Sequence, residues 1–166
     1  MPLTLILTRH AKSAWDDPSL DDFERPLNGR GRSSALKIGN WLVANGHLPD
    51  TVLVSGARRT VETWSRMADV MPSTATMVSE PALYLASSDV ILRVLQARKS
   101  PAIMLIAHNP GIGDFASRIL SQTPDHEKFD KYPTTATTVM EFDAPEWSEV
   151  QWGSGKLIDF VVPREL

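Results

Sequence analysis

The sequence predicts an α/β fold in which helices cover both faces of a mostly parallel sheet, as a three-layer α/β/α sandwich. Short apolar runs rich in β-branched residues alternate with segments of helical periodicity, and glycine or proline stands where several of them end. The chain has 166 residues, of which 42% are hydrophobic, so one core can be buried without disulfide support. Because no repeat, low-complexity tract or linker interrupts this pattern, residues 1–166 are expected to form a single domain.

Six segments are predicted to be strands. Three of them, LTLILT, TVLVS and AIMLIA, are continuous apolar runs of the kind that is buried on both faces of a sheet. The third segment is short, and the last two close the domain. In chain order, the expected strands are residues 3–8, 51–55, 77–80, 102–107, 137–142 and 157–162.

Four segments between these strands are predicted to be helices, over residues 33–45, 59–71, 87–97 and 110–120. Gly46 stands where the first should end, and Pro72 stops the second. Ser87 or Ser88 can cap the third, and Pro110 fits the first turn of the fourth.

Charge and composition exclude several classes of protein. The 17 Lys and Arg residues are interleaved with 20 Asp and Glu residues, a pattern that argues against nucleic-acid binding. No apolar stretch is long enough to span a membrane, and the run at residues 3–7 is too short for a secretory signal. The absence of cysteine excludes a thiolate nucleophile. We therefore expect a cytoplasmic protein that binds neither nucleic acid nor membrane.

Polar residues follow three of the predicted strands directly. In parallel α/β sheets the carboxyl ends of the strands form the ligand-binding edge, so these side chains should converge there. Arginine guanidinium groups match phosphate oxygens in pairs, which indicates a phosphate pocket. The residues concerned are Arg9 and His10 after the first strand, Ser55, Arg58 and Arg59 after the second, and His108 and Asn109 after the strand at 102–107.

Histidine is the nucleophile that this pattern favours. The sequence contains no GxxxxGK[ST] phosphate loop, no HExxH motif and no acidic cluster suited to Mg²⁺, so neither a metal nor another cofactor is expected. A neutral imidazole can attack phosphorus and form a phosphohistidine, which divides one difficult transfer into two easier ones. Neighbouring arginines would neutralise the charge on the phosphoryl oxygens.

Three sequence blocks resemble the histidine phosphatase superfamily, which includes the cofactor-dependent phosphoglycerate mutases. They are LTRHAKSAW at residues 7–15, VLVS at 52–55 followed by Arg59 and Thr63, and IAHN at 106–109. Their order and spacing agree with the family over about residues 3–120. The short chain and the RPL segment at 25–27 resemble the SixA-like phosphohistidine phosphatase branch.

The resemblance implies a phosphoglycerate mutase-like fold and a role for each matching residue. His10 would be the nucleophile that accepts phosphate, and Arg9, Arg59 and His108 would form the phosphate pocket. Ser13 and Asn109 would contact the substrate. The chain departs from the family pattern at two positions, with Ala11 where glycine is usual and Gly56 where proline is frequent.

A general acid is missing from the segment where related mutases and broad phosphatases carry one. Residues 82–85, ALYL, are apolar except for one phenol. Because imidazole, with a conjugate-acid pKa of about 6.5, leaves far more easily than an alkoxide, this favours phosphohistidine in a protein as the substrate. Two alternatives stay open: a small-molecule phosphoesterase or mutase with Glu80 or Asp89 as the acid, and a catalytically idle domain that binds a phosphorylated protein.

Overall fold

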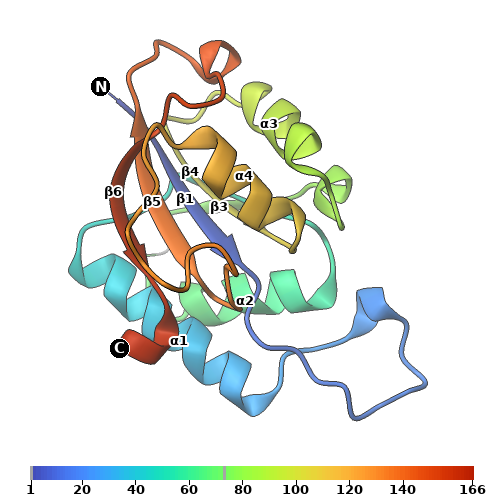
Figure 1. Ribbon diagram of the computed structural model, residues 1–166. Coiled ribbons are helices and arrows are strands. Elements are labelled where there is room, and N and C mark those ends of the chain that lie inside the picture. The colour runs from blue at the N-terminus through green and yellow to red at the C-terminus, as the bar shows by residue number, and fades with distance from the viewer. Residues whose placement is uncertain (1, 73) are drawn as a thin grey trace.

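The computed structural model describes residues 2–72 and 74–166, and in these ranges one six-stranded sheet is covered by four α-helices (Figure 1). The strands are β1 Leu3–Arg9, β2 Thr51–Val54, β3 Thr76–Ser79, β4 Ala102–Ala107, β5 Thr137–Phe142 and β6 Lys156–Val161. The helices are α1 Gly29–Ala44, α2 Arg58–Ala68, α3 Ser88–Gln96 and α4 Gly111–Ile119. All ten elements predicted from the sequence are therefore confirmed.

The sheet has the strand order β3-β2-β4-β1-β5-β6. Neighbouring strands pair in parallel from β3 through β1, whereas β5 is antiparallel to β1 and β6 is antiparallel to β5. Only β5 therefore runs against the others among the described strands, which confirms a mostly parallel sheet. Since β2, β4 and β1 are adjacent, the residues that follow them meet at one edge.

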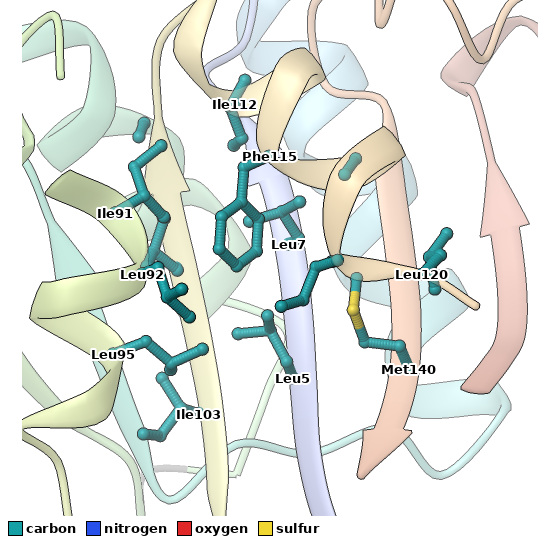
Figure 2. Close-up of a cluster of buried hydrophobic side chains, with 14 of the residues drawn as sticks. Leu5, Leu7, Ile91, Leu92, Leu95, Ile103, Ile112, Phe115, Leu120 and Met140 are labelled. Carbon is teal, nitrogen blue, oxygen red and sulfur yellow. The ribbon is translucent and has the colours of Figure 1, made fainter. Parts of the chain in front are cut away.

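Two apolar clusters lie on opposite faces of the sheet, and they confirm the three-layer architecture. Leu5 and Leu7 of β1 pack against α3 and α4, as Figure 2 shows around Phe115. Ile6, between them in sequence, faces the other cluster, which contains Ile38 of α1 and Met67 of α2. This alternation follows from the period of two along a strand, and it explains why β1 is apolar on both faces.

The start of α1 was predicted wrongly. The helix begins at Gly29 rather than at residue 33, and the Asn28 side chain caps it by accepting a hydrogen bond from the Gly31 amide at 2.8 Å. A Cβ atom on Gly31 would lie 2.1 Å from the backbone oxygen of Lys12, so glycine is needed for this close approach. Gly29 and Gly31 both have low helix propensity, which explains why the sequence pattern missed the first turn.

Short 3₁₀ turns add connections that the sequence pattern did not indicate. They span Asp22–Glu24, Pro81–Leu83, Trp147–Glu149 and Pro163–Glu165. The last of these contacts α1, so the C-terminal turn lies beside the helix that follows the loop after β1 (Figure 1). Within the described residues, none of the helices has the length and apolar character needed to cross a membrane.

Candidate active site

A cavity of about 470 Å³ opens at the carboxyl ends of β1, β2 and β4. All six site residues predicted from the sequence line it, namely Arg9, His10, Ser13, Arg59, His108 and Asn109. The remaining lining residues are Lys12, Trp15, Arg25, Leu85, Pro133 and Thr134. The strand ends therefore bring together two histidines and several cations from segments far apart in the sequence.

His10 is buried and oriented by the backbone. Its Nδ1 atom lies 2.7 Å from the carbonyl oxygen of Ala11, which can only accept, so Nδ1 carries the proton and Nε2 keeps its lone pair. The pKa of His10 is lowered to about 4, chiefly by burial and also by the charges of Arg9 and Arg59, against the opposing effect of the Ala11 bond. At neutral pH the ring is therefore an uncharged nucleophile.

His108 lies beside His10, with the ring centroids 5.3 Å apart. Its Nε2 atom is 2.7 Å from the hydroxyl of Ser55, and that hydroxyl is 2.9 Å from Thr60 Oγ1. Burial, followed by the charges of His10 and Arg59, lowers the pKa of His108 to about 3. Ser55 therefore positions His108. The sequence analysis places Ser55 after a predicted strand but assigns it no function.

Arg59 is buried on α2 and is held by the loop between β1 and α1. Its Nη1 donates to the Asp22 carbonyl oxygen at 2.7 Å, and its Nη2 donates to Asp22 Oδ2 at 3.0 Å. The Tyr84 hydroxyl donates to the same Oδ2 at 2.5 Å. This bond and the Arg59 guanidinium lower the pKa of Asp22 to about 2, although burial opposes the shift. The neighbouring Arg58 is exposed and does not line the cavity.

Arg25 is a cation of the cavity to which the sequence reasoning assigned no role. Its guanidinium bonds Asp22 Oδ1 at 2.7 Å and the Ala14 carbonyl oxygen at 3.1 Å, and it also donates to the Ser13 hydroxyl. The Trp15 ring covers it, with its centroid 3.2 Å from the guanidinium carbon. The sequence feature that could have identified Arg25 is the RPL segment at 25–27, which the sequence analysis uses only to indicate a branch of the family. Ser13 therefore binds Arg25 as well as lining the cavity.

Arg9 and Asn109 both contact the loop that precedes β5. Arg9 Nη1 donates to the Tyr132 carbonyl oxygen at 3.3 Å, and burial followed by the charge of Arg59 lowers its pKa. The amide nitrogen of Asn109 donates to the carbonyl oxygens of Lys131 and Tyr132, each at 3.0 Å. The Asn109 side chain therefore holds this loop against the end of β4.

The two departures from the family pattern fit the local backbone. Ala11 has a negative φ, and its amide donates to Thr63 Oγ1 at 2.9 Å while Thr63 donates to the Arg59 carbonyl oxygen at 2.6 Å. This pair of bonds ties the segment of His10 to α2. Gly56 has φ of +93°, which the ring of a proline cannot adopt, so the glycine accompanies a different turn after β2.

Carboxylates are absent from the cavity wall as far as residues 2–72 and 74–166 define it. Glu80 pairs with Arg98 at 2.5 Å, and Asp89 pairs with Arg118 at 3.2 Å, so both candidate acids face other partners. Tyr84 is a poor proton donor because burial and its bond to Asp22 raise its pKa. The described residues contain no group of three His, Asp or Glu side chains arranged to hold a metal ion.

No family model matches the chain. An uncharacterised chloroplastic protein of Arabidopsis thaliana is 35% identical over 126 residues, which cover 69% of this chain and 58% of the plant protein. This chain therefore matches little more than half of that relative's length.

Solved structures give the more extensive likeness. A structure assigned as the phosphohistidine phosphatase SixA of Agrobacterium tumefaciens has a TM-score of 0.78 and 26% identity, covering 98% of this chain and 99% of that one. A phosphoglycerate mutase of Plasmodium falciparum shares the fold, with a TM-score of 0.63 and 20% identity over 96% of this chain and 91% of its own. Three sequence blocks meet in one cavity of this chain, which has a SixA-like, phosphoglycerate mutase-like fold, and its structural neighbours are phosphatases of the histidine phosphatase superfamily.

Proposed function

We propose that the chain is a metal-independent phosphatase that removes phosphate from phosphohistidine in a protein substrate, through a phosphohistidine intermediate on His10. One observation carries this proposal: a buried, neutral His10 lies among Arg9, Arg25 and Arg59 in a cavity whose described wall has no carboxylate. The cations suit a phosphoryl group, and the lack of an acid suits a leaving group that departs without one.

In the first step, His10 Nε2 attacks phosphorus in line with the bond to the substrate imidazole. The new N–P bond forms as the old one breaks, and the departing imidazole nitrogen takes a proton from water. Arg9, Arg25 and Arg59 neutralise the charge on the three equatorial oxygens. In the second step, water attacks phosphorus and the bond from phosphorus to His10 Nε2 breaks, so that His10 returns to its neutral form. One proton of this water stays on the released phosphate, and the other neutralises the hydroxide left by the first step.

The geometry gives less support to the small-molecule phosphoesterase and to the idle binding domain. Glu80 and Asp89 point to ion-pair partners, and Asp22, whose pKa is about 2, is ionised at neutral pH and cannot donate a proton. A domain that merely bound phosphate would need the cations alone. The Nδ1 bond of His10 to Ala11, which leaves Nε2 free, is an arrangement that catalysis uses.

The test compares hydrolysis of a phosphohistidine peptide with that of O-phosphoserine. Because a general acid contributes about 10²-fold or more to expulsion of an alkoxide, the serine ester should be slower by at least about that factor. His10→Ala should abolish turnover of both and remove the acid-labile ³²P label that the wild type carries after rapid quenching. Equal rates on the two substrates would contradict the substrate assignment, and full activity of His10→Ala would contradict the mechanism.

A further inference from the structure

A second cavity, of about 370 Å³, adjoins the catalytic one and shares Lys12, Pro133 and Thr134 with it. We call it the basic groove. Its remaining lining residues come from α1, from the loop before β5 and from the C-terminal turn beside α1. The groove therefore continues the catalytic cavity outward along a surface made by separate parts of the chain.

The lining of the basic groove is strongly cationic. It contains six of the chain's 17 Lys and Arg residues, and no acidic residue contributes to the lining as the structure describes it. None of these six makes an ion pair within residues 2–72 and 74–166. The six residues are Lys12, Arg30, Lys37, Lys128, Lys131 and Arg164. In a chain with a net charge of −3, such a concentration of unpaired cations favours an anionic ligand.

The α1 wall of the groove has a regular arrangement. Arg30, Ser33, Ser34 and Lys37 follow one another at i, i+3, i+4 and i+7, which places them on one face of the helix. The seven steps along the helix from Arg30 to Lys37 span about 10 Å at ~1.5 Å per residue. One phosphate or carboxylate cannot occupy that length, whereas an extended peptide, rising ~3.3 Å per residue, would cover it with about three residues.

The positive region has a definite far end. Beyond Lys128 and Arg164, a smaller cavity of about 290 Å³ is lined by Asp125, Glu127 and Glu165 as well. Anions are therefore favoured between the catalytic cavity and Arg164, and disfavoured past it. This confines the complementary negative charge to a short stretch next to the phosphorylated residue.

We infer that the basic groove binds acidic side chains of the substrate protein close to its phosphohistidine. The inference rests on the proposed function and adds the chemistry of the partner. Hydroxyls of Ser33 and Ser34 can donate to the same carboxylates that Arg30 and Lys37 attract. Lys12, which lines both cavities, lies where the phosphohistidine and its acidic flank would meet.

Two synthetic peptides of equal length test this, each with one phosphohistidine, flanked on both sides by Glu in one and by Gln in the other. The wild type should show a kcat/KM about tenfold higher on the Glu peptide at low salt, because two or three exposed ion pairs can form with Glu and none with Gln. The ratio should approach one as salt screens the charges. A wild-type ratio near one at low salt would overturn the inference.

A charge-reversal pair locates the effect. Arg30→Glu combined with Lys37→Glu should reduce the ratio to one or below. Arg93→Glu combined with Lys156→Glu makes the same change in net charge at exposed residues outside both cavities, and should preserve the ratio. A ratio unchanged in the first variant, or lost equally in both, would overturn the inference. If wild type hydrolyses neither peptide, the proposed function itself is wrong, and this inference fails with it.

Discussion

The cations of the catalytic cavity and those of the basic groove lie on adjoining surfaces but are held differently. Arg25 and Arg59 are buried and fixed by Asp22, with bonds of 2.7 to 3.0 Å. Arg30 and Lys37 are exposed and have no ion-pair partner in the described part of the chain. Fixed donors suit a transition state of defined geometry, whereas exposed, unpaired ones suit recognition of side chains that vary in position.

The largest effect should come from removing a fixed donor. Arg59→Ala should lower kcat/KM by about 10²- to 10³-fold on every phosphorylated substrate, as losing one oxyanion donor costs ~3–4 kcal/mol in other enzymes. The exposed neighbour Arg58 supplies the control, since Arg58→Ala should leave kcat/KM nearly unchanged. Steady-state kinetics on phosphohistidine and on both peptides measure this. A loss confined to the Glu peptide would place Arg59 with the groove and break the distinction.

A smaller effect should follow when the anchor of these donors is weakened. Asp22→Asn removes the charge that Arg25 and Arg59 share, and kcat/KM should fall about five- to tenfold, a moderate loss because the Asp22 side chain is 43% exposed. Asp21→Asn is the matched control, because Asp21 is exposed and its side chain makes no capping bond. An increase in kcat/KM for Asp22→Asn would show that Asp22 competes with phosphate for Arg59.

The smallest expected effect is a shift in the pKa values of two histidines, which reports on the electrostatics of the catalytic cavity. His10 and His108 should stay neutral down to about pH 5 in NMR titrations of their Cε1–H resonances, since their pKa values lie near 4 and 3. His10→Ala assigns one resonance. Because the unfolded chain protonates both residues below about pH 6.5, it binds more protons, so the free energy of unfolding should fall as pH drops from 6.5 toward 4. Midpoints near 6.5 would contradict a buried, cationic site.

The sheet was predictable because burial on both faces leaves a strong pattern in β1, β2 and β4. The first turn of α1 was not, because Gly29 and Gly31 have low helix propensity and Gly31 is needed for close packing against Lys12. Helix propensity and capping rules describe a segment and its neighbours in sequence, so they carry no information about a close contact between two distant backbone segments.

The candidate site also contains residues that the sequence could predict and residues that it could not. His10 and His108 follow strands, so topology alone brings them together. Asp22 and Arg25 lie in a loop without periodicity, which the Ser13 to Leu27 bridge closes on itself. Their contacts depend on the path of that loop, and the sequence pattern could not predict that path.

Gly31 has a consequence for how a bound protein would be aligned. The Lys12 carbonyl oxygen, two residues after His10, accepts a hydrogen bond from the Asn28 amide at 3.0 Å and lies against the Cα of Gly31. The spacing between the nucleophile and the first turn of α1 is thus set by main-chain atoms. Surface substitutions along α1 could then change which partner is preferred while the distance from His10 to the start of the helix stays constant.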